Sequence, residues 1–484
     1  MDQHKRLLRP QEEPDSPAGR LRLIVLLPAA LLLLLAAAGI CREEGTLRLL
    51  YTGAALGGLY VMALLARLLA PQGGRLWLVL LFVGAVVLRA AFDLKWTVWP
   101  HGEYLTGWNL ALELSRAGVG EWSGLIQNAG AAGVAAQAVY ESLLLRLFGP
   151  TLAAVQIPGA VWGGVSCLLT ALIGEKLTGS RLAGLIAGGM LAFCPTLLFS
   201  AGVLTVMPLY TALLLAGVWL LLCRPCPEAW LNHALAGGAW GLGQLLLPGL
   251  PIPLGAAVLW LLITLPGRNR DKTLAAQIGA LAAGFFGVWL VLGGLLWLLT
   301  GVGPLAGLAL SWEGSLRQLA GKLRTQFASY DYSWARLDRG IPLRDKIIDN
   351  VMHPLLQSYA LGLLLLALWG TLIKVKQAGR RELLPYALLL AGAGAAAVTA
   401  ADPIANGWVL PLLAIWGAAP AGQLAEWTLL MAAPEGGKGR KKAPPLPMPL
   451  WVVKLVVSVA VYAIMLALVL IFFTGNGVFI YEAF

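Results

Sequence analysis

The sequence predicts an all-α membrane protein: a polytopic bundle of about 13 transmembrane helices with a cytoplasmic N-terminus and two long outer-face loops carrying short interfacial helices. Hydrophobic residues make up 59% of the 484 residues and charged residues 12%, with a mean hydropathy of +0.77. Soluble domains carry about a quarter charged residues. Apolar runs near the roughly 20 residues that cross hydrocarbon recur along the chain. Short basic loops between them fall on one side when the runs alternate.

The chain begins with a polar, basic tail, and its first apolar run is too long for a cleaved signal peptide. The expected segments are a cytoplasmic tail at 1–21, three transmembrane helices in 22–92, a first outer loop at 93–150, a transmembrane core at 151–299, a second outer loop at 300–353, C-terminal transmembrane helices in 354–473 and an outer tail at 474–484. The expected spans are about 22–40, 48–69, 75–92, 151–174, 181–201, 208–223, 231–247, 251–266, 273–299, 354–373, 383–400, 407–432 and 450–473.

Orientation follows from the basic loops, which mark the cytoplasmic side. With the N-terminus inside, all of the following groups are cytoplasmic: Arg67 and Arg75; Lys176 and Arg181; Arg268, Arg270 and Lys272; Lys374, Lys376, Arg380 and Arg381; Lys438, Arg440, Lys441 and Lys442. One missed helix would reverse every later loop, so the agreement favours this count. The expected location is the cytoplasmic (plasma) membrane, with the active face outside.

The net charge of +11 does not indicate nucleic acid, because the basic residues lie in separate loops and no recognition motif accompanies them. The five cysteines lie mostly in or near apolar runs and do not resemble a secreted disulfide framework. Cys223 and Cys226 form a CxxC near His233, which offers three zinc ligands where a structural site uses four. We therefore expect no resident metal site there.

The first outer loop holds two carboxylates near the predicted membrane boundary, Asp93 and Glu103. A carboxylate between lipid and water can act as a general base toward a hydroxyl, because partial desolvation raises its proton affinity. A surface pair of Asp93 with Lys95 and a solvated Glu103 explain the same residues without catalysis.

Aromatic and basic residues of both outer loops could contact a substrate. Trp96, Trp99, Tyr104 and Trp108 could form a stacking floor for a sugar, although interfacial belts also concentrate Trp and Tyr. Arg116, Arg317, Lys322 and Arg324 could hold a lipid phosphate, although such residues also touch anionic head groups without specificity.

Three motifs between Arg89 and about Leu222 carry a family resemblance: E-Y-L-T-G-W-N-L-A at 103–111, L-L-L-R-L-F-G at 143–149 and A-G-L-I-A-G-G-M-L-A-F-C-P-T at 183–196. With them the chain resembles the GT-C membrane glycosyltransferases, in the branch of protein O-mannosyltransferases and aminoarabinose transferases. Elsewhere the likeness is limited to hydropathy and loop placement.

The resemblance implies an inverting enzyme that takes a sugar from a polyprenyl-phosphate carrier at the outer leaflet. The family's base, usually Asp, matches Glu103, with His101 two residues earlier. Our leading hypothesis adds Asp93, which would orient the acceptor or help to hold a divalent cation. Tyr104, Trp108 and Asn109 of the motif are expected at the substrate, and Arg116 with residues 317–324 at the departing phosphate. The family's Pro-Pro-Gly-Tyr-like turn is replaced by Ala132–Ala136, and its later carboxylate is absent from Leu204–Pro208.

Three function classes follow. The first is a glycosyltransferase whose partners are a lipid-linked sugar, membrane lipid and an acceptor that is a lipid, glycan or protein. The second is a protein of the same architecture that binds such a lipid or a partner protein without catalysis, which the altered motifs favour. A secondary transporter needs charged residues at the bilayer midplane, and the predicted spans nearly lack them, with Gln156, Gln244 and Gln277 as the main polar exceptions.

Overall fold

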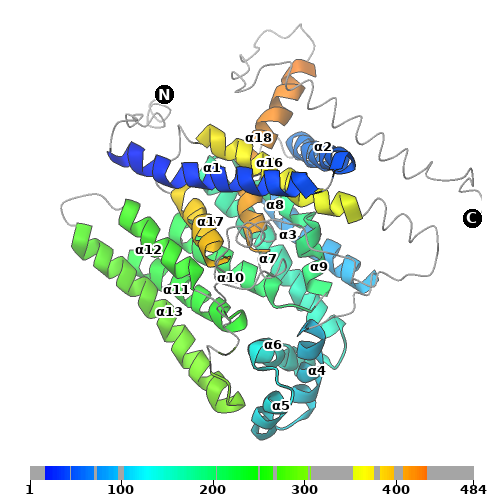
Figure 1. Cartoon of the computed structure of the whole chain (residues 1–484), viewed down its shortest axis with the longest axis vertical. Coiled ribbons are helices and arrows are strands. Elements are labelled where there is room, and N and C mark those ends of the chain that lie inside the picture. Colours follow the sequence, from blue (N-terminus) through cyan, green and yellow to red (C-terminus); the bar gives the residue numbers. More distant parts are fainter. Residues whose placement is uncertain are drawn as a thin grey trace, which may run out of the picture.

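The computed structural model describes residues 17–43, 45–69, 74–95, 103–202, 204–248, 251–264, 270–303, 306, 353–374, 382–396 and 407–432. Every regular element within these residues is a helix, so the all-α prediction is confirmed there (Figure 1). The helices are α1 (Pro17–Glu43), α2 (Gly45–Leu69), α3 (Arg75–Lys95), α4 (Glu103–Arg116), η2 (Val119–Glu121), α5 (Trp122–Asn128), η3 (Ala132–Val134), α6 (Ala135–Phe148), α7 (Ala153–Thr178), α8 (Arg181–Ala192), α9 (Pro195–Gly202), α10 (Met207–Cys223), α11 (Ala229–Leu246), α12 (Ile252–Thr264), α13 (Arg270–Thr300), α16 (His353–Lys374), α17 (Leu383–Ala396) and α18 (Val409–Ala432).

Four of the described helices are long and apolar enough to cross a membrane, by length and composition. The qualifying stretches are Tyr51–Leu68 in α2, Arg75–Asp93 in α3, Ala153–Thr178 in α7 and Lys272–Thr300 in α13. The other predicted spans that fall on described residues also coincide with helices, most of them with shorter apolar stretches. The predicted span at 450–473 lies outside the described residues.

The region expected as one span at 181–201 consists of two helices instead. Helix α8 ends at Ala192 and α9 begins at Pro195. Proline lacks the N–H that would continue the backbone ladder, and its ring clashes with the carbonyl four residues earlier. The hydrophobic run therefore continues through 201, but the helix does not.

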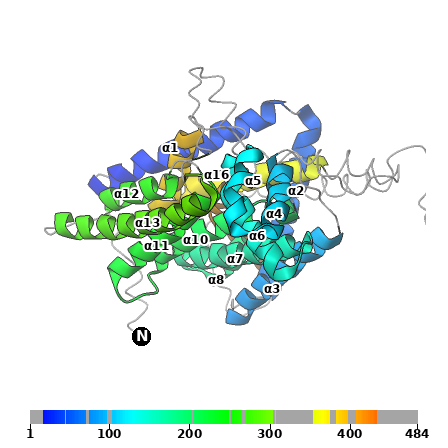
Figure 2. The same cartoon turned by 90° about the horizontal axis from the view of Figure 1, so that it is seen from below.

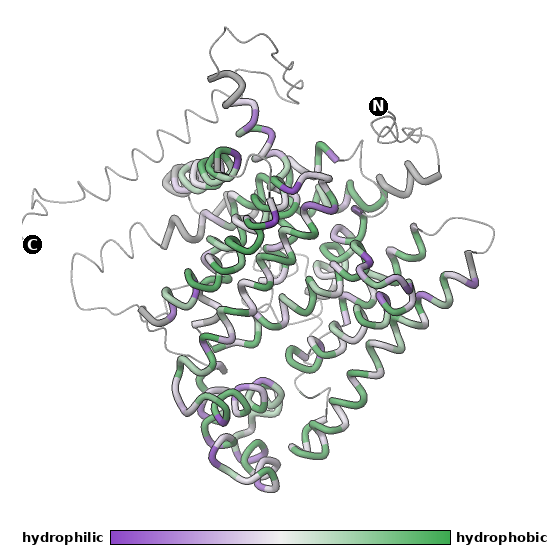
Figure 3. Tube along the Cα trace, turned by 180° about the vertical axis from the view of Figure 1, so that it is seen from behind, coloured by the Kyte–Doolittle hydropathy of each residue, from purple (hydrophilic) through white to green (hydrophobic). Residues whose placement is uncertain are grey.

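A large apolar core joins the helices from both ends of the chain. Helices α7, α8 and α10 lie at its centre, with α16 and α18 packed against α2 and α8. Figure 3 shows hydrophobic residues along most of these helices. On α13 the side chains of Leu290, Val291 and Leu298 are exposed, as expected for a helix that faces lipid.

The backbones of α11 and α13 approach each other closely. A Cβ built at Gly237 of α11 would overlap the carbonyl oxygen of Leu281, and one built at Gly284 of α13 would overlap that of Ala234. Small residues allow such close crossings between membrane helices. These glycines therefore set the distance between the two helices.

Helices α4, α5 and α6 form a separate group at one end of the molecule (Figures 1 and 2). We call this group the outer unit, after the side of the membrane that the sequence predicts for it. Its own core is built around residues such as Trp108, Leu114 and Trp122. The core is completed by Val155 near the start of α7 and Val302 just beyond α13. The outer unit thus packs against the ends of two helices of membrane-spanning length.

Candidate active site

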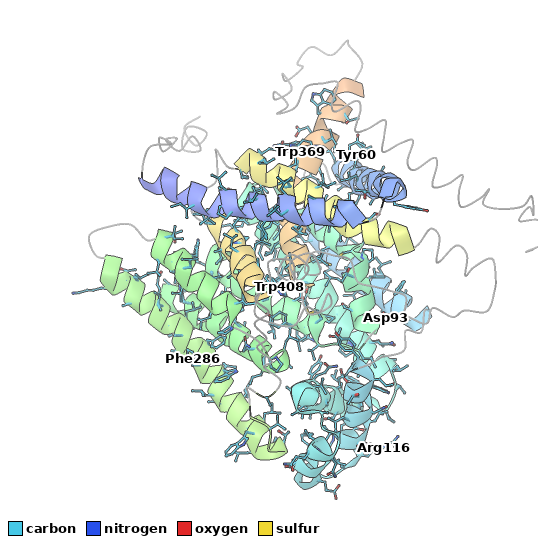
Figure 4. The ribbon with its side chains drawn as sticks, in the orientation of Figure 1. Tyr60, Asp93, Arg116, Phe286, Trp369 and Trp408 are labelled. Atoms are coloured by element: carbon cyan, nitrogen blue, oxygen red, sulfur yellow. The ribbon has the colours of Figure 1, made fainter. Side chains whose placement is uncertain are left out.

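Asp93 lies near the end of α3 and is buried, with 2% of its surface exposed. Neither carboxylate oxygen has a hydrogen-bond partner among the described residues. Figure 4 shows Asp93 at the end of α3 nearest the outer unit. The expectation of a surface pair does not fit this burial, since an exposed ion pair would leave the carboxylate in water.

Arg89 lies one helical turn before Asp93 and is completely buried. Its Nη2 donates to the carbonyl oxygen of Leu191 at 3.1 Å, and its Nη1 donates to that of Ala85 at 3.3 Å. A Cβ at Gly163 of α7 would lie 2.6 Å from the Cδ and Nε atoms of Arg89. The absent side chain at Gly163 therefore provides the space for the guanidinium.

Leu191 belongs to the last turn of α8, where backbone carbonyls lose their helical donors. In a continuous helix its donor would be the N–H four residues on, and that residue is Pro195, which has none. The amide of Cys194, at 3.2 Å, and the guanidinium of Arg89 take its place. Arg89 thus joins α3 to the break between α8 and α9.

Helix α4 begins at Glu103, the candidate base, whose side chain lies outside what the structure describes. An acidic residue at a helix N-terminus also stabilises that end through the helix dipole. Of the other motif residues, Trp108 is buried in the outer unit's core, Tyr104 is half-buried and Asn109 is exposed. Trp108 is thus a core residue, and Asn109 points away from that core.

Arg116 ends α4 and is exposed. At 1.5 Å per residue, the Cα atoms of Glu103 and Arg116 lie about 20 Å apart along the helix axis. Figure 4 shows Arg116 far from Asp93, at the distal end of the outer unit. The structure therefore does not bring Arg116 together with the start of α4.

A second arginine, Arg146 of α6, binds carbonyl oxygens at the C-terminal end of α4. Its Nη2 donates to the carbonyl oxygens of Leu114 at 2.7 Å and Ala117 at 2.6 Å. The guanidinium lies 5.1 Å from the ring centroid of Trp122, whose Nε1 also donates to Leu114. These contacts satisfy carbonyls at a helix C-terminus and hold the outer unit together.

A buried polar group links α6 to the turn between α9 and α10. The Nε2 atom of Gln137 donates both to Oε1 of Glu141 and to the carbonyl oxygen of Leu204, each at 2.8 Å. Leu204 is fully buried and has a left-handed backbone, with φ of 59°. A Cβ at Gly107 of α4 would lie 3.5 Å from the same Nε2, so α4 passes directly over this group.

His101, Arg317, Lys322 and Arg324 lie outside the described residues. No group of three or more His, Cys, Asp or Glu side chains among the residues that the structure describes could hold a metal ion.

Sequence patterns did not identify three buried polar side chains of this region: Arg89, Gln137 and Glu141. An arginine inside the apolar run of α3 is a recognisable signal, because charged residues in membrane helices are costly and seldom lack a role. Glu141 and Gln137 give no such signal, since their burial depends on a turn 67 residues beyond Gln137.

Comparisons with known proteins give no relative: no family model, no curated protein and no solved structure matches the chain.

Proposed function

We propose that the protein is a multi-pass glycosyltransferase of the cytoplasmic membrane, with its N-terminus inside. In this proposal it transfers a sugar from a polyprenyl-phosphate carrier to an acceptor at the outer face, with inversion. Glu103 is the general base, Asp93 orients the acceptor hydroxyl, and basic residues of 317–324 face the departing phosphate. The proposal rests on the motif resemblance together with the position of the outer unit.

The position of the outer unit is the observation that supports this function best. The unit follows the end of α3, and its core includes residues from the start of α7 and from just beyond α13. In the proposed topology these are the outer ends of all three helices. Glu103 begins the first helix of the unit, and along the chain only residues 94–102 lie between it and the buried Asp93.

Exposed apolar side chains on α6 also support a position of the outer unit at the lipid surface. Leu143 is 49% exposed, Leu147 is 74% exposed and Phe148 is 66% exposed. Apolar side chains exposed on a short helix beside membrane spans are typical of a helix lying in the interface. A lipid-linked donor would approach the outer unit from that side.

The distance between Glu103 and Arg116, at the two ends of α4, limits the roles that both residues can have in one reaction. The anomeric carbon and the phosphate of a lipid-linked sugar are joined through one oxygen, so one reacting centre cannot contact both ends of a helix about 20 Å long. If Glu103 is the base, Arg116 is a surface residue of the outer unit. The phosphate clamp then falls to Arg317, Lys322 or Arg324.

The test is genetic complementation with a matched carboxylate control. Envelope glycans of a strain lacking the protein are compared after complementation with wild type, Glu103→Gln or Glu113→Gln. Glu113 lies on the same helix and is exposed. We expect a glycan that is lost in the deletion to return with wild type and Glu113→Gln but not with Glu103→Gln.

The second candidate is binding of a lipid-linked sugar or a partner without turnover. It is favoured by the turn at 204–206, which carries no carboxylate and is held by Gln137 instead. Rescue of the lost glycan by Glu103→Gln, at the level reached with Glu113→Gln, would favour this function over catalysis.

A further inference from the structure

Glu141 is a buried carboxyl that the proposed reaction does not use. Only 1% of its surface is exposed, and its Oε2 has no hydrogen-bond partner among the described residues. Its other oxygen accepts from Gln137. Burial raises the pKa of Glu141 to about 8, and the hydrogen bond from Gln137 lowers it by less.

Among the residues that the structure describes, no cation lies near this carboxyl to stabilise its ionised form. The segments 195–202 and 204–206 and the first 14 residues of α7 contain no ionisable side chain. Helix α11 carries only His233, near the end away from Leu242 and Leu246, which pack beside α6. Of the neighbouring groups on α6 itself, Arg146 is engaged by the end of α4, and Tyr140 accepts from Trp162.

Helix α4 brings its own ionisable residues to α6, and the described ones do not neutralise Glu141. Glu113 and Arg116 are exposed near its far end, and Tyr104 is half-buried near its start. The position of α4 opposite Gln137 is Gly107, which carries no side chain. Within the described part of the chain, burial and the amide of Gln137 are therefore the main influences on the protonation of Glu141.

Gln137 connects Glu141 to two elements, α4 and the turn at Leu204. Its single amide nitrogen bridges Glu141 and the left-handed turn at Leu204, and it lies against the backbone of α4 at Gly107. Gly107 is one turn after Glu103 on the same helix. Loss of the bridge would free α4 and the turn at the same time.

We propose that Gln137 and Glu141 form a proton-dependent latch: with Glu141 neutral, α6 holds α4 and the turn at Leu204 in place. Ionisation of Glu141 creates a buried charge that favours an open state, in which water reaches the carboxylate and both elements are released. The latch is a property of the folded chain. Its effect on sugar transfer rests on the proposed function, because release would displace the helix that begins at Glu103.

The pH dependence has a defined sign. A carboxyl whose pKa is higher in the closed state than in the open state binds its proton more tightly when closed. Its stabilisation of the closed state is complete below the ordinary Glu pKa, near 4.5, and is lost as the pH rises to about 8. Acid therefore tightens the latch, and alkali loosens it.

Hydrogen exchange of the full-length protein in lipid nanodiscs, measured from pH 5.5 to 8.5 and corrected for the intrinsic exchange rate, tests the latch. We expect local opening of 135–148 and 204–206 to become about tenfold more frequent per pH unit up to pH 8 in the wild type. In Glu141→Gln this opening should not change with pH. Glu113→Gln should behave as wild type.

Two results would overturn the latch: a wild-type profile without pH dependence in these segments, or the same dependence in Glu141→Gln. If Glu141→Gln does not fold, the wild-type titration decides, with α8 as internal reference. Opening that rises in 135–148 and 204–206 but not in 181–192 supports the latch, whereas a uniform rise contradicts it. A second variant, Gln137→Leu, should increase opening of 204–206 at every pH.

This experiment needs no substrate. A latch observed in a protein that transfers no sugar would leave the inference standing and remove the proposed function. Sugar transfer that depends on Glu103 in a protein without the exchange signature would do the reverse.

Discussion

The guanidinium of Arg89 donates a hydrogen bond to the carbonyl oxygen of Leu191, 3.1 Å away, in the last turn of α8. Leu191 stands four residues before Pro195, the residue that has no N–H to offer it. A buried charge on α3 thus serves the carbonyl exposed by a helix break on another element. This contact fixes α3 beside the break, close to the buried Asp93.

Replacing Arg89 by Met should strongly destabilise the protein. The change leaves a carbonyl with one donor fewer and a buried carboxylate without its neighbouring positive charge. A hydrogen bond from a charged group contributes about 1.5–3 kcal/mol, and Arg89 makes two such bonds, so we expect a loss of about 3 kcal/mol. Thermal unfolding of the purified protein in detergent measures the loss, with exposed Arg116→Met as the control, for which a change within about 0.5 kcal/mol is expected.

The role of Pro195 can be tested in the same series. Pro195→Ala restores a backbone N–H toward Leu191, so Arg89→Met should cost less in that background than in the wild type. A double-mutant cycle measures the coupling, which we expect at about 1 kcal/mol. Additive effects of the two changes would show that Arg89 acts independently of the helix break.

Gly284→Ala should disrupt the crossing of α11 and α13. The added Cβ would overlap the carbonyl of Ala234, so the helices would have to separate, at a cost of about 1–3 kcal/mol. Gly287 lies on the same helix with open space around its Cβ position. Gly287→Ala should leave the melting temperature unchanged or raise it, because alanine favours helix. Equal melting temperatures of the two variants would contradict the close crossing.

Arg146→Lys should loosen the outer unit. Lysine keeps the charge and has three N–H donors, but its side chain is shorter than that of arginine and it loses the contact of the planar guanidinium with the ring of Trp122. We expect a loss of about 1 kcal/mol and faster hydrogen exchange in α4. Exchange in α4 that equals the wild type would show that the arginine does not hold the end of this helix.

The sequence predicts the helices well where a single apolar run decides them. Helix α3 was expected at 75–92 and extends from Arg75 to Lys95, because nothing interrupts its apolar run. The run at 181–201 is equally apolar, but Pro195 divides it. Hydropathy measures the affinity for lipid, whereas the helix end depends on a backbone hydrogen bond that hydropathy does not include.

The candidate site was predictable only in part, for a reason of geometry. The sequence grouped Glu103, Tyr104 and Trp108 in one motif of the first outer loop, and the structure places all three on α4. The sequence could not reveal that α4 directs Trp108 into a core, or that α4 keeps Arg116 far from Glu103. Glu141 is defined by a contact between α6 and a distant turn, and such contacts appear only after the chain has folded.

The formation of free polyprenyl phosphate is the most direct test of the proposed transferase. The purified protein in nanodiscs, supplied with lipid extract and acceptor membranes from the same cells, is followed by mass spectrometry. The account predicts turnover by the wild type, and a rate at least about 100-fold lower in Glu103→Gln with an unchanged melting temperature, since a general base contributes about that much. Release of polyprenyl phosphate by Glu103→Gln at the wild-type rate would contradict it.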